Sequence, residues 1–347
     1  MYPLVSKSGK RAADCPMVDQ ARTERDELAK RRLRKVLATN IVAGARTLEQ
    51  KIADAGPNHM RVDPHVLTTA RQNLQKQGVI AIRRAGGIAW YHLSDTSPAS
   101  IDQKLKTLVP IHDAMQDNQF CKRLGQALEI AVYRALIAQP QLSTLGAFLD
   151  LHEHDDKHLY GKEEPPSTVS SRTCKGRLDF IVITKTGGFA GIEVKNTREW
   201  LYPDRDEVRA LLEKCTALDI VPVLVARRIP YVTFKLLNAC GAIIHQTYNQ
   251  LFAAADGELA NKAKHKDLLG YHDIRLGNQP DTRLVKFVST NLPGLIHSQR
   301  TVFDDFKDLL RAFGTGDMPY EEFAARVRRR SAGTNEDHDW DEYDGER

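Results

Sequence analysis

The sequence predicts an α/β protein, and two observations indicate that class. Short apolar runs that are typical of buried strands alternate with helical patterns between residues 119 and 255. On either side the pattern changes, because the first third holds helical patterns and one hairpin, and residues 256–330 hold helical patterns. We therefore expect an α/β core between two regions of different organisation.

The first third of the chain predicts three helices and a hairpin. The helical patterns cover residues 23–42, 47–55 and 63–76. Asp63 and Pro64 suit the N-cap and first position of the third helix, and Gly78 suits its end. Strands are expected at 79–84 and 88–93, because Gly86 and Gly87 between them permit the positive φ of a tight turn.

Three helices followed by a hairpin resemble a winged helix-turn-helix domain, here over residues 23–95. In that family the third helix enters the major groove and the hairpin touches the flanking backbone. Winged helices also serve as dimerisation modules, so protein contact is the alternative to DNA binding. The resemblance implies DNA contacts from seven side chains of the third helix and the hairpin: Thr68, Thr69, Arg71, Gln72, Gln75, Arg83 and Arg84.

The central strands carry the most informative residues. Leu178 to Ile183 is an apolar run that contains Asp179, and the next run contains Glu193 and Lys195. Successive side chains of a strand point to opposite faces, so Glu193 and Lys195 project together. If the two runs pair through the turn near Gly187, both carboxylates can converge on one divalent ion.

Carboxylate oxygens without nearby Cys or His ligands suit Mg²⁺, and Mn²⁺ can substitute. Such an ion can acidify and orient water and polarise a phosphoryl oxygen, while Lys195 offsets the growing negative charge. The pattern therefore favours phosphodiester hydrolysis. The alternative is an exposed cross-strand ion pair without catalytic function.

Asp179 and Glu193-Val194-Lys195 resemble the PD-(D/E)xK nuclease superfamily, which includes many restriction enzymes and archaeal Holliday-junction resolvases. Leu178 stands where the family name has Pro. The resemblance implies a restriction-endonuclease-like mixed sheet flanked by helices, over residues 119–255. It also implies a metal-site role for Glu129, in the helical pattern before the first strand, and for the Val194 carbonyl.

Further elements of this region follow in order. A helix is expected from about Asp204 to Ala217, then a strand at 221–226, a helix at 231–239 and a strand at 242–245. Arg227 and Arg228 end the first of these strands, where they would meet phosphate or remain solvated. Asn196 and His245 are candidates to support the site, and for His245 the favoured alternative is a structural histidine with satisfied hydrogen bonds.

The remaining segments complete the predicted organisation. Residues 1–22 are expected to be a flexible N-terminus, and 96–118 a linker or bridging helix. Residues 256–330 form a C-terminal helical region, and 331–347 an acidic disordered tail. A chain of 347 residues is long enough for two or three domains.

Charge and cysteine content limit the environment. The net charge of +5 is modest, but basic residues cluster at 30–35 and 326–330, as nucleic-acid binding would require. Five cysteines without paired spacing indicate reduced thiols. No apolar run reaches membrane-spanning length and the N-terminus lacks the apolar core of a signal peptide, so a cytoplasmic protein is expected.

Together these features predict a Mg²⁺-dependent DNA endonuclease, with restriction or anti-phage defence as its setting. The resemblance implies a homodimer or a partner nuclease, because one such site cuts one strand. One alternative is a structure-specific nuclease of repair, recombination or transposition. Another is a DNA-binding regulator with an inactive nuclease fold.

Overall fold

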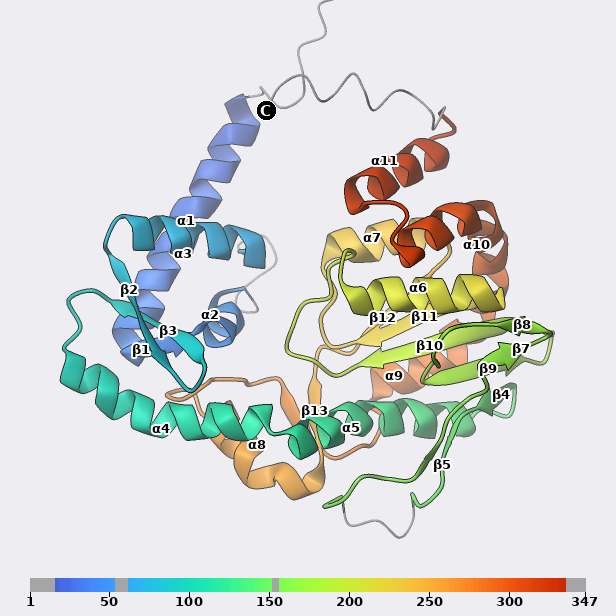
Figure 1. Cartoon of the computed structure of the whole chain (residues 1–347), viewed down its shortest axis with the longest axis horizontal. Coiled ribbons are helices and arrows are strands. Elements are labelled where there is room, and N and C mark those ends of the chain that lie inside the picture. The colour runs from blue at the N-terminus through green and yellow to red at the C-terminus, as the bar shows by residue number, and fades with distance from the viewer. Residues whose placement is uncertain (1–15, 54–61, 152–155, 335–347) are drawn as a thin grey trace, which may run out of the picture. The chain divides into compact units, whose positions relative to one another are not determined.

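The computed structural model describes residues 16–53, 62–151 and 156–334, with side chains from Thr23 onward. It has helices and mixed sheets, which confirms the α/β class (Figure 1). The chain divides into two compact units. Unit 1 comprises Met1–Gln116 and Asn261–His272, and unit 2 comprises Asp117–Ala260 and Asp273–Arg347.

Unit 1 begins with helices and continues with a small sheet. Its sheet is antiparallel with strand order β1-β3-β2. The helix expected to begin at Thr23 begins at Pro16. Residues 98–116, within the expected linker, form a helix of this unit. The elements are α1 (Pro16–Asn40), β1 (Val42–Gly44), α2 (Ala45–Ile52), α3 (Pro64–Lys76), β2 (Ile80–Ala85), β3 (Ile88–Leu93) and α4 (Pro98–Gln116).

The core of unit 1 follows helical periodicity. Ala29, Leu33 and Leu37 recur every four residues along α1 and are completely buried. They share one apolar cluster with residues of α2, α3 and β2. Asp63 occupies the N-cap position of α3, although its side chain makes no capping hydrogen bond. Packing of the apolar faces therefore stabilises these helices more than capping does.

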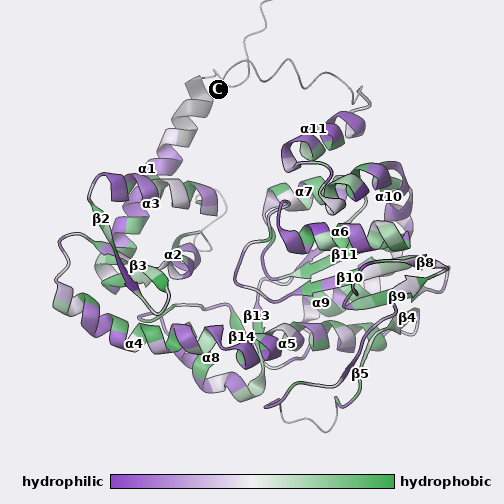
Figure 2. Cartoon of the chain, in the orientation of Figure 1, coloured by the Kyte–Doolittle hydropathy of each residue, from purple (hydrophilic) through white to green (hydrophobic). Residues whose placement is uncertain are grey.

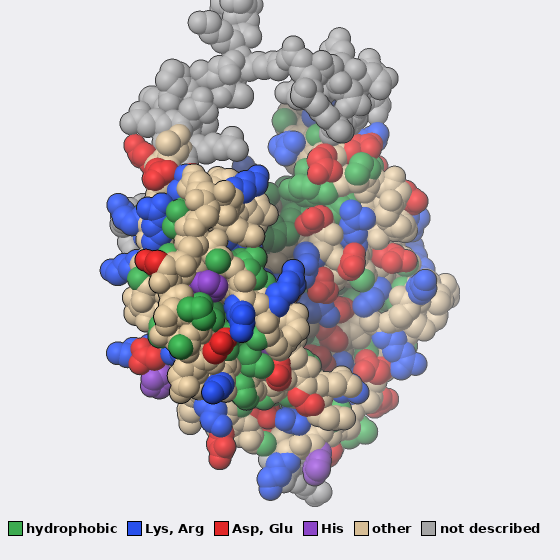
Figure 3. Space-filling model, turned by 60° about the vertical axis from the view of Figure 1, so that its left-hand side comes forward, with side chains coloured by type: hydrophobic (Ala, Val, Ile, Leu, Met, Phe, Trp, Pro, Cys, Tyr) green, Lys and Arg blue, Asp and Glu red, His purple; other side chains and the backbone are tan. Residues whose placement is uncertain are grey.

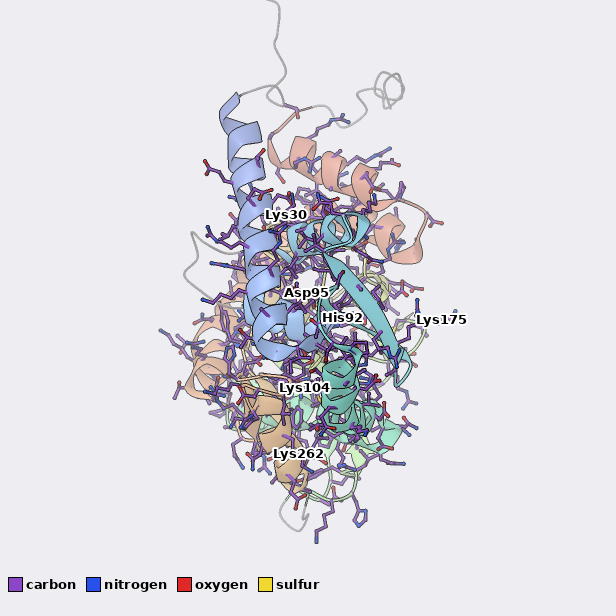
Figure 4. All side chains as sticks on the ribbon, turned by 90° about the vertical axis from the view of Figure 1, so that its left-hand side faces the viewer. Lys30, His92, Asp95, Lys104, Lys175 and Lys262 are labelled. Carbon is purple, nitrogen blue, oxygen red and sulfur yellow. The ribbon has the colours of Figure 1, made fainter. Side chains whose placement is uncertain are left out.

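A distant segment completes unit 1. Residues 261–272 include the end of α8 (Gly257–Lys264), and Figure 4 labels Lys104 of α4 and Lys262 of α8. The ammonium of Lys104 donates to the carbonyl of Asp267 at 2.6 Å. Lys51 of α2 donates to the carbonyl of Lys266 at 2.7 Å. This segment thus connects two elements of unit 1.

Unit 2 is built on a five-stranded mixed sheet of order β12-β11-β10-β9-β4. The pairs β4–β9 and β9–β10 are antiparallel, whereas β10–β11 and β11–β12 are parallel. All six residues of β11 are buried, as expected for a parallel strand covered on both faces (Figure 2). The strands are β4 (Leu142–Leu145), β9 (Phe180–Thr184), β10 (Phe189–Lys195), β11 (Val221–Ala226) and β12 (Ile243–Gln246).

Helices cover both faces of this sheet. One face packs with α6, α7, α10 and α11 in one apolar cluster, and the other packs with α5, α9 and a π-helix in a second. The later helices of the predicted C-terminal region, from α9 onward, therefore contribute to the core of unit 2, whereas residues 261–272 belong to unit 1. These elements are α5 (Asn118–Ile137), α6 (Asp206–Leu218), α7 (Tyr231–Ala239), α9 (Thr282–Lys286), the π-helix (Phe287–Asn291), α10 (Leu292–Thr315) and α11 (Tyr320–Ser331).

A long excursion separates β4 from β9, and its described residues, 146–151 and 156–179, include four short strands. These are β5 (Ala147–Phe148), β6 (Lys162–Glu163), β7 (Thr168–Val169) and β8 (Arg172–Thr173). After β12 come β13 (Gln250–Phe252), the 3-10 helix at Ala254–Asp256 and β14 (Ile274–Leu276), with β13 and β14 parallel.

Several expectations concern residues outside the described part of the chain. Residues 1–15 of the expected flexible N-terminus and 335–347 of the expected acidic tail are among them. Within the described ranges, no helix is both long and apolar enough to cross a membrane. The four described cysteines, Cys121, Cys174, Cys215 and Cys240, are free thiols.

Candidate active site

The predicted acids and lysine meet at one edge of the sheet of unit 2. Lys195 is the last residue of β10, and it stands in register with Ala226 at the end of β11. Asp179 immediately precedes β9, which runs antiparallel to β10, so the start of β9 lies at the same edge. Glu193 lies two residues before Lys195 on β10.

The backbone around Asp179 has the pattern of a β-bulge. Its N–H donates to the carbonyl of Ile192 at 3.1 Å, although Ile192 already stands opposite Phe180. Asp179 and Phe180 thus both face Ile192 of β10. Such a bulge changes the direction in which the Asp179 side chain points. The Oδ2 atom of Asp179 accepts a hydrogen bond from the Val194 N–H at 2.7 Å. The carboxylate is thereby fixed beside the end of β10.

The Val194 carbonyl points towards the same place. In a β-strand, the N–H and C=O of one residue face the same neighbouring strand. Since the N–H of Val194 reaches Asp179, its carbonyl also faces the side of β9, beyond the point where β9 begins. A backbone oxygen therefore accompanies the carboxylates.

Glu193 is buried between two lysines. Its Oε1 atom accepts from Lys195 Nζ at 2.7 Å, and its Oε2 atom accepts from Lys214 Nζ of α6 at 3.2 Å. Ile192 and Val194, its neighbours in the strand, pack in the apolar cluster with α5. Strand alternation thus places Glu193 and Lys195 on the face towards α6, as the sequence predicts.

Glu129 approaches from α5, and Lys162 of β6 connects it to Asp179. The ammonium of Lys162 lies 2.8 Å from Glu129 Oε2 and 3.4 Å from Asp179 Oδ1. Asn196 holds α5 beside the end of β10, because its amide donates to the Leu124 carbonyl at 2.6 Å. Asn196 therefore supports the geometry of the cluster from a buried position.

The surroundings of Asp179 raise the cost of ionising its carboxyl group. Burial raises the pKa of Asp179, and the charges of Glu129 and Glu193 raise it further, to about 7. Burial lowers the pKa of Lys195, but the adjacent Glu193 outweighs it, so the net pKa is raised. Lys195 thus keeps its proton at neutral pH, which suits it to stabilise negative charge rather than to accept a proton.

Two lysines of this cluster, Lys162 and Lys214, are not among the residues predicted from the sequence. Lys162 lies in the irregular excursion before β9, where no strand or helix period indicates the direction of a side chain. Lys214 lies in α6, one residue before the buried Cys215. Its proximity to Cys215 on a helix that packs against β10 was the available signal.

The residues fit a hard divalent ion in part. Carboxylate and carbonyl oxygens are suitable ligands, and Mg²⁺ is commonly held by one or two carboxylates while it keeps several waters. Asp179, Glu193 and the Val194 carbonyl provide such a set. Within the described ranges, however, no three or more His, Cys, Asp or Glu side chains are grouped closely enough to hold a metal ion. Glu129 engages Lys162 instead.

The residues expected to contact DNA lie on α3 and the hairpin of unit 1. Arg71 is half-buried and lies over the Tyr91 ring, with its guanidinium carbon 4.5 Å from the ring centre. Thr68 is half-buried, and the hydroxyl of Thr69 donates to the His65 carbonyl. The exposed candidates on α3 are Thr69, Gln72 and Gln75.

The two hairpin arginines differ in their partners. Arg83 forms an ion pair of 3.0 Å with Asp102 of α4, and both side chains are exposed. Arg84 is exposed. Figure 3 shows several Lys and Arg side chains on the surface around α1 and α3, where Arg31 and Arg34 are among the exposed residues.

Arg227 neither meets solvent nor is available to a phosphate, the two roles expected from the sequence, but has a structural role. It is 2% exposed and forms an ion pair of 2.7 Å with Asp273. Arg228 instead lies over the exposed Tyr248, 5.3 Å from the ring centre, and Arg283 of α9 lies 5.1 Å from the same centre. Tyr248 adopts a positive φ of 65°, which is uncommon for a residue with a side chain.

His245 is half-buried and packs against an aromatic ring. Its ring stacks on Phe287 at 4.2 Å between centres, and its Nε2 atom has no hydrogen-bond partner among the described residues. Burial lowers its pKa to about 4, so the ring is neutral at physiological pH. The stacking of His245 agrees with the expected structural role. Its hydrogen bonds are incomplete, however, because Nε2 is unpaired among the described residues.

The chain matches no protein-family model, no curated protein and no solved structure. Its function is therefore inferred from the chemistry of the site.

Proposed function

We propose that the chain is a metal-dependent DNA endonuclease that hydrolyses phosphodiester bonds. The observation that carries this proposal is the meeting of Asp179, Glu193 and Lys195 at one sheet edge, with Glu129 close by. A merely structural ion pair needs no third carboxylate. Here burial, together with the charges of Glu129 and Glu193, raises the pKa of Asp179 to about 7.

The proposed cofactor is Mg²⁺, with Mn²⁺ able to substitute, held by Asp179, Glu193 and the Val194 carbonyl. When bound, the ion would supply a positive charge that polarises the phosphate and favours deprotonation of water. Lys195, charged at neutral pH, offsets the negative charge that develops on the phosphoryl oxygens. Hydrolysis joins a water oxygen to phosphorus and releases one ester oxygen, which gains a proton.

The order of elements supports the resemblance to restriction-endonuclease-like proteins. A helix, three antiparallel strands, a helix and a parallel strand follow one another as α5, β4, β9, β10, α6 and β11. In unit 1 the order α1, β1, α2, α3, β2 and β3 supports a winged helix. The proposed substrate is accordingly duplex DNA, contacted by α3 and the hairpin.

A second group of side chains supports contact with DNA near the cluster. Arg228 and Tyr248 follow β11 and β12, whose last residues stand in register with Lys195. Neighbouring strands lie about 4.8 Å apart, so the ends of β11 and β12 are about 5 and 10 Å from the end of β10. The guanidinium groups of Arg228 and Arg283 suit contact with backbone phosphates, and the exposed Tyr248 ring suits stacking on a base.

The test is cleavage of supercoiled plasmid in Mg²⁺ by the wild type and by Asp179→Ala, Glu193→Ala and Lys195→Ala. We expect nicking or linearisation by the wild type and loss of most activity in each variant, with DNA binding retained. The control is Asp95→Asn, an exposed acid of unit 1 (Figure 4). Equal cutting by the wild type and the three site variants would indicate a contaminating nuclease and refute the assignment.

The substrate distinguishes the proposed settings. Restriction or anti-phage defence predicts cutting at defined sites in linear duplex, with two chains supplying the two strand cuts. A structure-specific nuclease of repair, recombination or transposition would prefer a nicked duplex or a four-way junction. A DNA-binding regulator would bind duplex without cutting it in Mg²⁺ or Mn²⁺.

A further inference from the structure

Lys162 is the least expected member of the carboxylate cluster. It lies on β6, in the excursion between β4 and β9, and its side chain is 11% exposed. Its ammonium contacts Glu129 at 2.8 Å, Asp179 at 3.4 Å and Glu164 at 3.6 Å. Three acids from three segments thus surround one cation of the chain itself.

The Lys162 ammonium lies where a two-metal site would hold its second cation. Phosphoryl-transfer sites with two metal ions place a second cation about 4 Å from the first and share a carboxylate between them. Asp179 would be that shared carboxylate, since Oδ2 faces the Val194 side and Oδ1 faces Lys162. Glu129 would be the further ligand of a second ion, and it already contacts Lys162.

We propose that Lys162 is a built-in cation that occupies the place of a second metal ion, so that each chain binds one divalent ion, at Asp179 and Glu193. This inference rests on the proposed function. Lys162 is then a positioning residue, because it holds Asp179 and Glu129 together through their charges. It also decides the metal stoichiometry of the site.

The surroundings of Lys162 keep its ammonium in place. Its Nζ atom lies within 3.6 Å of carboxylate oxygens of Glu129, Asp179 and Glu164. Its ammonium also lies 5.4 Å from the centre of the Phe180 ring. The excursion is anchored by Gln126 of α5, which bonds both the N–H and the carbonyl of Tyr160. A divalent ion would have to displace a charged, anchored side chain.

The experiment measures Mn²⁺ stoichiometry by calorimetry, with electron paramagnetic resonance to detect coupling between paired Mn²⁺ ions. The proteins are the wild type, Lys162→Met, Lys162→Arg and the control Lys185→Met, an exposed lysine at the β9–β10 turn. We expect one uncoupled ion for the wild type, the arginine variant and the control. Lys162→Met should bind a second ion with spin coupling, because Glu129 and Asp179 are left without their cation.

Two outcomes would overturn the inference. One is two coupled ions in the wild type, which is measured even if Lys162→Met does not fold. The other is a folded Lys162→Met that still binds a single ion. A parallel plasmid assay separates these outcomes from failure of the proposed function: a wild type that binds two ions and cuts DNA remains a nuclease. A wild type that binds no ion and cuts nothing refutes both proposals.

Discussion

Two buried charge clusters in unit 2 differ in the charges that surround their central acid. Asp273 is one acid between two arginines, Arg198 at 2.9 Å and Arg227 at 2.7 Å. Burial opposes its ionisation, but the arginines outweigh burial and lower its pKa. Asp179, in contrast, has two further carboxylates near it, and its pKa is raised. The same type of side chain is thus stabilised as an anion in one place and destabilised in the other.

The difference separates a structural cluster from a candidate catalytic one. The Asp273 cluster is complete, since Arg227 also donates to the carbonyls of Thr197 and Arg198. In the Asp179 cluster, Lys162 and Lys195 only partly offset burial and the charges of Glu129 and Glu193, so the pKa of Asp179 stays raised, and a divalent ion would relieve that repulsion. The direction of the pKa shift of the central acid therefore marks the site better than burial of charge.

The largest expected effect is on cleavage. Asp179→Asn should slow plasmid nicking by at least about 10³-fold, because a neutral amide is a weak ligand for a hard cation. Asp273→Asn should leave nicking within about 3-fold at a temperature where the variant is folded. Rates measured in Mg²⁺ with circular dichroism on the same samples would check this. Equal losses in both variants would remove the distinction between the clusters.

The next effect is on stability. Asp273→Asn should lower the free energy of unfolding by about 3–5 kcal/mol, because Arg227 would remain buried without its anion. The lowered pKa means that the contribution of Asp273 is present at neutral pH and is lost as pH falls below about 4. Urea unfolding measures it. Asp304→Asn, which removes a half-exposed ion pair with Arg300, should change stability by about 0.5 kcal/mol or less.

Asp179→Asn should raise the free energy of unfolding, whereas Asp273→Asn should lower it. Because the folded pKa of about 7 exceeds the unfolded value, ionisation costs stability as pH rises from about 4 to 7. In EDTA at pH 8 the variant should therefore be more stable than the wild type, on the order of 2 kcal/mol. The gain should shrink as pH falls to 5. A variant that is less stable than the wild type at pH 8 would show that Asp179 is a structural anion like Asp273.

The smallest effect concerns unit 1, whose candidate contacts are exposed rather than buried. Arg84→Ala should weaken duplex binding by about 3- to 10-fold. The slope of log binding constant against log salt concentration should fall by about one, because one phosphate contact is lost. Mn²⁺ binding should not change. Fluorescence anisotropy at several salt concentrations measures the effect, with Lys106→Ala of α4 as the exposed control. If both variants bind alike, the hairpin is not a specific contact.

The sequence allowed the central part of the site to be predicted because strands have a simple period. Glu193 and Lys195 are two residues apart, so they share a face wherever the strand lies. The short turn at Gly187 and Gly188 left antiparallel pairing as the simplest connection to Asp179. Local rules therefore sufficed for three residues within one hairpin.

Other features could not be predicted because they depend on contacts between distant segments. Lys162 reaches the cluster from an excursion without periodicity. Arg227 meets Asp273 across 46 positions, which no local pattern indicates. The same reason applies to the C-terminal helices, since their periodicity predicted helices but not the sheet that they would cover.

The return of residues 261–272 to unit 1 has a consequence for synthesis of the chain. The carbonyls that Lys51 and Lys104 bind belong to residues made long after the rest of unit 1. The nascent chain must therefore emerge from the ribosome as far as His272 before its first unit is complete. A fragment that stops at Gln116 would lack those partners, so an expressed N-terminal piece should carry residues 261–272 on a linker.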